Sequence, residues 1–276
     1  MTRVIFDGHG QMCNRLWQYA DQVAWAMKHG GKVVCLLWDP SLDDFPALRD
    51  NPYIRFPFYV KAREGGKWAA LYRRALNKLV LSKSAQRLLE SPFFRKRGFI
   101  LGREIIFAHD YYPEVWAQEK DLFAPSDSIV ENIDAHFSRF RHDDTSSIVG
   151  VHIRKGDYRR YLDGQLFYED EEYAGFMQQV TQLLGQDTRF LLVSNEKINR
   201  EHFLPFRLLD IATTTAAEDM YALSRCDYLM GPYSTFSGWA SLYGGVPCYF
   251  FKRGAKMDRS DFQVVRTMTQ PKNLNL

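Results

Sequence analysis

Hydrophobic and polar positions along the N-terminal part of the chain follow first a strand pattern and then a helix pattern. Residues Arg3–Phe6 are mostly apolar and short enough for a buried strand, and KVVCLL (32–37) has the same character. Between them, apolar residues recur at helical spacing at Leu16, Tyr19, Ala20, Val23 and Met27. The pair Gly30-Gly31 ends this helix. A strand, a helix and a strand in this order predict a parallel sheet covered by helices.

The C-terminal half alternates strands and helices without interruption. Its expected strands are SIVGVHI, RFLLVSN, FRLLD, DYLMG and VPCYFF. Its expected helices are EEYAGFMQQVTQLL, AAEDMYALSRC and STFSGWASLYGG. This pattern predicts a second parallel, doubly wound sheet with right-handed crossovers. The fold class is therefore α/β, with two Rossmann-like domains at residues 1–145 and 146–276.

The region between the two α/β patterns has prolines and a basic helical segment, KWAALYRRALNKLVLSKSAQRLLE (67–90). From Lys61 to Arg103 there are twelve Lys or Arg and two Glu, a local net charge of +10. We expect the apolar side chains of this segment to cover a core while the cations face solvent; they are Trp68, Leu71, Leu76, Leu79 and Leu88. Two interpretations of the cations stay open: a solvated helix face, or binding to an anionic acceptor or membrane surface.

Composition limits the classes of protein. The 276 residues are 46% hydrophobic and 25% charged, which predicts folded domains, and the net charge of +3 does not indicate nucleic-acid binding. The four cysteines are scattered and predict neither a disulfide framework nor a zinc site. Because no signal peptide or membrane span is apparent, we expect a cytoplasmic protein, with peripheral contact at the inner face of the membrane through residues 61–103 as an open alternative.

One strand leads directly into a cluster of charge. In IVGVHIRKGDY (148–158), an apolar run ends in His152, Arg154, Lys155 and Asp157. Residues just beyond the carboxyl end of a parallel strand line the ligand crevice of a doubly wound sheet. His152 and Arg154 lie two apart and so share one side of an extended chain, and a guanidinium fork matches phosphate oxygens. The alternative is a surface ion pair between Arg154 and Asp157.

Two further strand ends carry polar side chains. Ser234, Thr235 and Ser237 follow DYLMG at an expected helix start, which is a natural anion site, with simple helix capping as the alternative. Ser194, Asn195 and Glu196 lie at the end of another strand, where ordinary turn chemistry is the alternative. We expect all three strand ends at one edge of the sheet.

Several familiar phosphate and metal motifs are missing. No G-x-G-x-x-G follows a strand and no Walker A motif occurs, which argues against hydride transfer and P-loop hydrolysis. No Asp-X-Asp is present, so the cations are the expected phosphate neutralisers and no metal is expected. The acidic run at Glu169–Glu172 reads as the first turn of a helix.

Three segments resemble one enzyme family. HIRKGDY (152–158) resembles the H-x-R-x-G-D motif of the α-1,2-, α-1,6- and protein O-fucosyltransferase superfamily, and looks closest to bacterial α-1,2-fucosyltransferases of glycosyltransferase family 11. CNRLWQYA (13–20) is similar to the family's G-N-Q-M-F-Q-Y-A, and STFSGWASLYGG (234–245) to its S-x-F-S-W-W-A-A-W-L. The three matches follow the family order, and the middle region carries no match.

The resemblance implies a GT-B fold of two Rossmann-like domains facing a cleft. Residues 1–145 would form the acceptor-side domain with a basic helical insertion, and residues 146–276 would bind GDP-fucose without a metal. Departures from the family pattern are Cys13 for glycine, Arg15 for glutamine, Lys155 for arginine and Gly238 for tryptophan.

The resemblance also implies roles for single residues. His152 and Arg154 would hold the donor diphosphate, and Asp219 would contact guanine. Thr235, Phe236 and Ser237 would line the diphosphate and fucose site. Asn14 and Arg15 would belong to a loop facing the cleft.

The expected reaction is transfer of L-fucose from GDP-fucose to a glycan hydroxyl with inversion, forming an α-1,2 linkage. Arg154 and the helix start at Ser234–Ser237 would stabilise the charge that grows on the departing phosphate. The base that accepts the hydroxyl proton stays open among Asp7, His9 and Asp157. Alternatives are a GT-B transferase for another nucleotide sugar, or a non-catalytic glycan- or nucleotide-binding module. Nucleic-acid binding is the weakest option.

Overall fold

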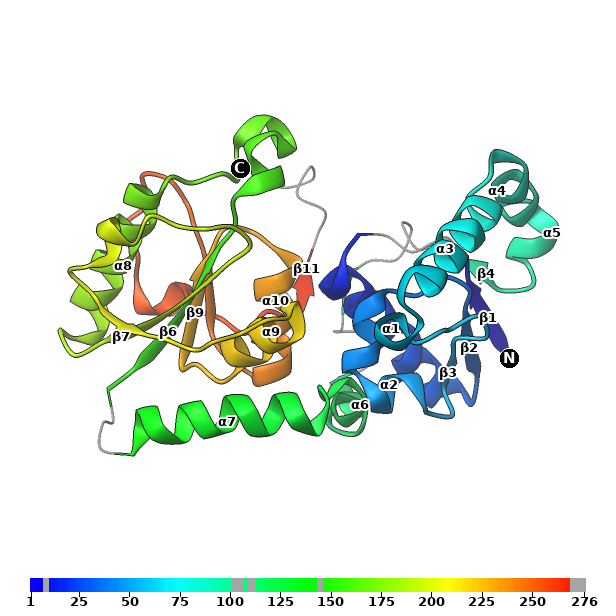
Figure 1. Cartoon of the computed structure of the whole chain (residues 1–276), viewed down its shortest axis with the longest axis horizontal. Coiled ribbons are helices and arrows are strands. Elements are labelled where there is room, and N and C mark those ends of the chain that lie inside the picture. Colours follow the sequence, from blue (N-terminus) through cyan, green and yellow to red (C-terminus); the bar gives the residue numbers. More distant parts are fainter. Residues whose placement is uncertain (7–9, 101–106, 109–112, 143–145, 269–276) are drawn as a thin grey trace. The chain divides into compact units, whose positions relative to one another are not determined.

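The computed structural model describes residues 1–6, 10–100, 107–108, 113–142 and 146–268 (Figure 1). The chain divides into two compact units, Met1–Ser126 and Asp127–Leu276. Each unit has its own parallel sheet with helices packed on it, as the hydrophobic pattern predicts.

The first unit has a four-stranded sheet in the order β3-β2-β1-β4, whose neighbouring strands pair in parallel. Its strands are β1 (Thr2–Ile5), β2 (Lys32–Cys35), β3 (Ile54–Arg55), β4 (Phe99–Ile100) and the short β5 (Phe107–Ala108). Its α-helices are α1 (Met12–His29), α2 (Pro46–Arg49), α3 (Ala62–Val80), α4 (Lys83–Leu89), α5 (Pro92–Arg95) and α6 (Pro113–Glu119). Two 3₁₀ helices also occur, η1 (Pro40–Asp44) and η3 (Lys120–Phe123).

Helix α1 confirms the first βαβ prediction. Its apolar positions Leu16, Trp17 and Val23 are fully buried. The helix ends where Gly30 adopts a left-handed conformation (φ 59°) and donates its N–H to the Ala26 carbonyl. Glycine reaches this region at little steric cost, so the predicted stop has a backbone cause.

The basic helical segment does not bury the residues that the sequence analysis selected. Leu76 packs with buried Val80 in a small cluster beside the sheet, but Trp68, Leu71, Leu79 and Leu88 are exposed. The prediction was wrong for these four. On α3 the side that packs on the unit is Ala69, Leu76 and Val80, one position after Trp68 and after Leu79, and on α4 no residue is buried. Helix α3 ends at Val80, and α4 begins at Lys83. Ser82 caps α4, because its hydroxyl accepts the Ala85 N–H (3.2 Å).

The second unit has a five-stranded sheet in the order β10-β9-β6-β7-β8, again with parallel neighbours. Its strands are β6 (Ile148–Ile153), β7 (Arg189–Ser194), β8 (Arg207–Leu209), β9 (Tyr228–Gly231), β10 (Cys248–Phe250) and the short β11 (Thr267–Met268). Its α-helices are α7 (Asp127–Arg141), α8 (Asp170–Leu184), α9 (Ala216–Ser224) and α10 (Thr235–Gly244). The 3₁₀ helices are η4 (Gly156–Arg159), η5 (Tyr161–Gly164), η6 (Arg200–Phe203) and η7 (Arg259–Asp261).

The strand order places a topological switch point beside the central strand β6. From β6 the chain adds β7 and β8 on one side, and then returns to place β9 and β10 on the other. The direction of winding therefore reverses between β6 and β9. In open α/β sheets, ligands bind beyond the carboxyl ends of the strands at such a point.

Helix α7 belongs to the second unit, although the sequence analysis expected the boundary near residue 145. Its apolar residues Ile129, Ile133 and Phe137 are buried, and α7 packs against α9. Asp134 on α7 pairs with Arg225 (2.7 Å) just after α9. An amphipathic helix in the sequence does not specify which sheet it covers, so only these contacts locate the division before Asp127.

Candidate functional site

The polar strand ends of the second unit meet at the switch point between β6 and β9. His152, near the end of β6, forms a hydrogen bond from Nδ1 to the Ser237 hydroxyl on α10 (2.8 Å). The Tyr158 hydroxyl, beyond β6, donates to the carbonyl of Tyr233, beyond β9 (3.0 Å). Two strand ends more than 70 residues apart in the sequence are thereby joined, as the parallel-sheet argument predicted.

His152 is buried and uncharged. Its ring lies 4.9 Å from the Phe236 ring, measured between centroids. Burial, assisted by the nearby Arg154 charge, lowers the pKa of His152 to about 3. A neutral imidazole can donate or accept a hydrogen bond but does not neutralise a phosphate, so the cationic part of this site falls to Arg154.

Arg154 is held at both its backbone and its side chain. Its N–H donates to the Tyr173 hydroxyl (3.0 Å), and its guanidinium pairs with Asp157 (2.9 Å) and lies 5.4 Å from the centre of the Tyr158 ring. The ion pair considered in the sequence analysis is thus present. It fixes a guanidinium on the loop directly after the central strand.

Lys155 has a different environment from its neighbour Arg154. Its ammonium is buried, donates to the Tyr168 carbonyl (2.7 Å) and pairs with Asp170 (2.8 Å) in the first turn of α8. Glu169 and Glu172 form a capping box at that turn, which confirms the acidic run as a helix start. The lysine that replaces the family's second arginine therefore anchors the loop to α8.

Two glycines allow the backbone to pass close to these groups. Gly156 has a φ of 53°, and a β-carbon there would lie 2.9 Å from a carboxylate oxygen of Glu196. Gly231 ends β9, where a β-carbon would lie 2.7 Å from the His152 carbonyl oxygen. A larger residue at Gly231 would push β9 away from β6, and at Gly156 it would strain the left-handed backbone.

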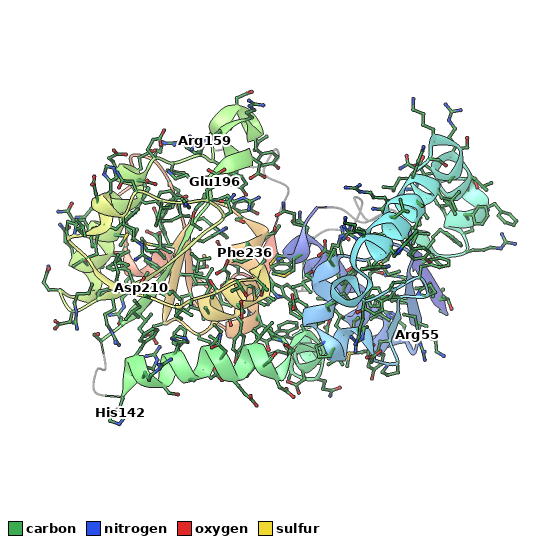
Figure 2. The ribbon with its side chains drawn as sticks, in the orientation of Figure 1. Arg55, His142, Arg159, Glu196, Asp210 and Phe236 are labelled. Carbon is green, nitrogen blue, oxygen red and sulfur yellow. The ribbon has the colours of Figure 1, made fainter. Side chains whose placement is uncertain are left out.

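The third strand end, after β7, contributes mainly turn contacts. Asn195 accepts the Lys155 N–H through its side-chain oxygen (2.9 Å), and the Ser194 hydroxyl accepts the Glu196 N–H (3.3 Å). Glu196 also lies 3.9 Å from Arg159, and the two labelled residues lie close together in Figure 2. These contacts tie the loop after β7 to the loop after β6.

The start of helix α10 completes the switch point. Ser234 is the N-cap, and its hydroxyl accepts the Phe236 N–H (3.2 Å). Ser237 lies in the first turn, where its hydroxyl forms the hydrogen bond to His152. Thr235 and Phe236 between them are only partly buried. The capping role considered earlier is confirmed, and the positive end of the helix dipole lies beside β6.

Asp219 lies in the first turn of α9, the helix that follows β8. The Thr213 hydroxyl donates to its carboxylate (2.6 Å). Burial raises the pKa of Asp219, while the hydrogen bond from Thr213 opposes that rise. A helix that follows a parallel strand begins at the carboxyl edge of the sheet, so Asp219 shares an edge with Arg154 and Ser234.

The candidate residues of the first unit differ from expectation. Asn14 and Arg15 lie in the first turn of α1 rather than in a loop, because the helix already begins at Met12. The Arg15 guanidinium donates to the carbonyls of Gly10 (3.4 Å) and Leu37 (3.2 Å), beside a small pocket that Tyr19 and Asp39 also line. The candidate bases Asp7 and His9 lie outside the described residues.

Three tyrosines support the site, and the sequence analysis gave none of them a role. The Tyr158 hydroxyl donates a hydrogen bond to the Tyr233 carbonyl, and the Tyr173 hydroxyl accepts one from the Arg154 N–H. Tyr158 could have been found, because it closes the HIRKGDY motif. Tyr173 and Tyr233 carry no comparable signal, since aromatic residues make up 15% of the chain.

The described residues show neither a metal-binding cluster nor a membrane-spanning helix. Within these ranges, no group of three or more His, Cys, Asp and Glu side chains is arranged to hold a metal ion. The helices of the same ranges include none that is both long and apolar enough to span a membrane.

Comparison with known proteins gives a family match and several structural neighbours. The sequence model of glycosyl transferase family 11 matches residues 103–249. A search of curated proteins returned no match. Fucosyltransferase NodZ from Bradyrhizobium is 18% identical, with a TM-score of 0.54 over 92% of this chain and 97% of that chain.

Two further solved structures are similar over almost the whole chain. NodZ alpha-1,6-fucosyltransferase soaked with GDP-fucose is 17% identical, with a TM-score of 0.52 over 95% of this chain and 97% of that chain. POFUT1 in its apo-form is 12% identical, with a TM-score of 0.55 over 91% of this chain and 97% of that chain. At such low identity the likeness shows the fold, and the expected GT-B class with two parallel α/β units is confirmed.

Proposed function

This chain belongs to glycosyl transferase family 11, whose model matches more than half of it, and from that premise we propose that it transfers L-fucose from GDP-fucose to a hydroxyl of a glycan. The observation that carries the proposal is the 2.8 Å bond between His152 and Ser237. It joins the HIRKGDY strand end to the start of α10 at the switch point, where phosphate ligands bind in this class of sheet.

The donor diphosphate needs positive charge and N–H donors, and the second unit offers both. Arg154 supplies a guanidinium with a fork of donors, and the first turn of α10 supplies backbone N–H groups together with the Thr235 hydroxyl. Neutral His152 adds one hydrogen bond without a further charge. As the donor leaves, negative charge grows on its phosphate, and this preorganised set stabilises it without rearrangement.

The guanine end of the donor is assigned to Asp219. Guanine presents two adjacent N–H donors on its Watson–Crick edge, which a carboxylate accepts as a pair, whereas uracil and adenine do not present such a pair. The Thr213 hydroxyl holds the Asp219 carboxylate from one side (2.6 Å). An asparagine side chain in its place would turn one acceptor into a donor, so Asp219→Asn should weaken GDP binding about tenfold or more.

The chemical step is a direct displacement at the anomeric carbon, with inversion and an α-1,2 linkage as the proposed outcome. The acceptor oxygen forms the new glycosidic bond, the bond to the diphosphate oxygen breaks with its electron pair, and GDP departs. A base takes the proton of the acceptor hydroxyl. Asp157 is a candidate for this role within the described residues, and Asp7 and His9 are the others.

The test is GDP release from GDP-fucose, with lactose-type and N-acetyllactosamine acceptors. We expect acceptor-dependent release by the wild type and a loss of roughly 10²–10³-fold in turnover for Arg154→Ala, the usual effect of removing one stabiliser of transition-state charge. Arg207→Ala is the matched control, because this exposed arginine lies at the amino end of β8, away from the carboxyl edge.

The outcomes separate the alternatives. Near-normal turnover in folded Arg154→Ala would overturn the assigned role. If neither acceptor supports release, titration with GDP, UDP and ADP decides the donor class. Binding of UDP or ADP in preference to GDP would contradict the donor assignment, and GDP binding without transfer to any glycan would indicate a binding module.

A further inference from the structure

Exposed apolar side chains gather on one part of the first unit. Among the described residues, twelve large hydrophobic side chains are exposed, and seven of them lie on or between α3, α4 and α5. They are Trp68, Leu71, Tyr72, Leu79, Leu81, Leu88 and Phe93. Trp68 is 80% exposed and Leu79 is 69% exposed. Single exposed hydrophobic residues are ordinary, but seven of them on three consecutive helices are typical of a surface that contacts another molecule or a membrane.

The same segment is strongly basic. Residues 67–97 contain nine Lys or Arg and one Glu, a net charge of +8. The cations are Lys67, Arg73, Arg74, Lys78, Lys83, Arg87, Arg95, Lys96 and Arg97. We name these nine cations and the seven exposed apolar residues the α3–α5 surface; Figure 1 shows its three helices in succession after β3, in cyan to teal.

Helix α3 arranges these residues in three parallel rows. Beyond Gly66 the buried row is Ala69, Leu76 and Val80. The residues that directly precede these three, Trp68, Ala75 and Leu79, form an exposed row, and Leu71 and Tyr72 widen it. The residues that precede the exposed row, Lys67, Arg74 and Lys78, form a cationic row. Because one residue turns a helix by about 100°, an apolar stripe lies between the protein core and a line of cations.

We propose that the α3–α5 surface binds the surface of an anionic lipid bilayer. Amphipathic helices at a membrane interface combine a Trp, Phe and Leu face with flanking Lys and Arg, and insert the apolar face at the headgroup boundary. The cations match the negative charge of the lipid headgroups, and their long stems let them reach the headgroups from a position beside the apolar stripe. This surface lies in the first unit and is independent of the donor site and of the proposed function.

Two other partners fit this surface less well. Two copies of the chain meeting through this surface would bring two patches of net charge +8 together, which is repulsive. RNA would satisfy the cations, but phosphate and bases gain little from the exposed aliphatic residues Leu71, Leu79 and Leu88. A bilayer is the partner that uses the charge and the apolar stripe together.

The experiment is sedimentation of the full chain with vesicles, either of phosphatidylcholine alone or with roughly a third phosphatidylglycerol. We expect binding to the anionic vesicles, weakened by salt, and little binding to neutral ones. Arg74→Glu/Lys78→Glu should weaken binding about 25-fold or more, since each cation near an anionic surface contributes about fivefold. Arg139→Glu/Lys256→Glu, with the same charge change on the second unit, should leave it nearly unchanged.

Insertion of the apolar stripe is tested separately. Leu79→Ser should weaken binding about fivefold or more, whereas Leu204→Ser, a leucine of similar exposure (74%) outside the surface, should not. Trp68 is also the most exposed of the six tryptophans, so lipids brominated on their acyl chains should quench wild-type fluorescence. Trp68→Phe should still bind vesicles but lose most of this quenching.

Each result bears on the proposal once matching thermal melts show that the variants are folded. Absence of binding to anionic vesicles would overturn it. Binding that depends on Arg74 and Lys78 but not on Leu79, with no quenching of Trp68, would also overturn it and favour a soluble polyanion such as RNA. Concentration-dependent dimers lost in Leu79→Ser, without vesicle binding, would assign the surface to a second copy.

Discussion

His152 shows how one residue's environment sets its chemistry. It lies in a charged motif, but β6 is buried along its whole length and the imidazole packs against Ser237 and the Phe236 ring. Burial keeps the ring neutral. The motif therefore places one charged side chain, Arg154, next to one uncharged hydrogen-bonding group.

The depressed pKa of His152 predicts a pH dependence of stability. Between pH 6.5, its ordinary pKa, and about 3, its pKa in the folded protein, the unfolded chain binds a proton that the folded protein does not. Stability contributed by His152 is therefore complete above about pH 7 and is lost as the pH falls. From pH 7.5 to 5 we expect the wild type to lose about 2 kcal/mol more unfolding free energy than His152→Asn.

Urea denaturation at the two pH values measures this difference, and other titrating groups cancel in the comparison. An equal pH dependence in the two proteins would show that His152 is not buried in its neutral form. Ser237→Ala serves as a control, because it removes the hydrogen-bond partner and leaves the titrating group in place.

Lys155 gives a second prediction at the level of one residue. Its buried ammonium is held by Asp170 and the Tyr168 carbonyl, and Lys155→Met would leave a largely buried carboxylate without its cation. Loss of one partner of a buried pair costs about 3–5 kcal/mol. We expect thermal or urea unfolding to show a loss of about 3 kcal/mol, and Lys155→Met/Asp170→Leu to recover part of it. Unchanged stability in the single variant would contradict this role.

Helix α10 shows how an element adapts to its neighbours. The family pattern has tryptophan where this helix has Gly238, and a β-carbon there would lie 2.3 Å from the Met268 sulfur and 3.4 Å from a Val265 methyl carbon. Met268 occupies the space that a larger side chain would need. The glycine is thus explained by packing within the second unit.

This packing predicts a coupling between two residues. Alanine normally stabilises a helix by about 1 kcal/mol relative to glycine, but here overpacking should outweigh that gain, so Gly238→Ala should lose about 1 kcal/mol or more. In a Met268→Ala background the same change should become stabilising. A double-mutant cycle of unfolding free energies measures the coupling, and strict additivity would contradict the packing explanation.

The whole molecule consists of two parallel α/β units, and its proposed chemistry draws on the carboxyl edge of the second sheet. There Arg154 and the start of α10 bring positive charge to one switch point. This set can balance the charge that develops on a departing diphosphate. Positive charge from the protein itself would then take the place of a bound metal ion.

The prediction at this scale is that the transferase works without a metal. GDP release in excess EDTA should stay within about twofold of the untreated rate, because in the proposed mechanism Arg154 and the α10 N–H groups supply the electrostatic stabilisation. Added Mg²⁺ or Mn²⁺ should change the rate equally little. A loss of activity in EDTA that Mn²⁺ restores would contradict the assignment.

The sequence by itself determined the elements and the chemistry at the strand ends. Alternation of apolar strands with amphipathic helices predicted both parallel sheets, since the 2.0 and 3.6 periods are local properties of the chain. The position of His152 near the end of a strand, and of Arg154 and Ser234–Ser237 just beyond strands, placed them at one edge, because parallel strands share their carboxyl ends. The motif also identified the family that residues 103–249 match.

Tertiary structure decided what depends on contacts between distant residues. The neutral state of His152 follows from burial by α10, and the buried pairing of Lys155 follows from the position of α8. Helix α3 has two adjacent apolar rows, and periodicity alone could not say which row the sheet would cover. The assignment of α7 to the second unit likewise needed its packing on α9. In each case the sequence supplied the side chain, and its neighbours in space supplied the environment that defines its role.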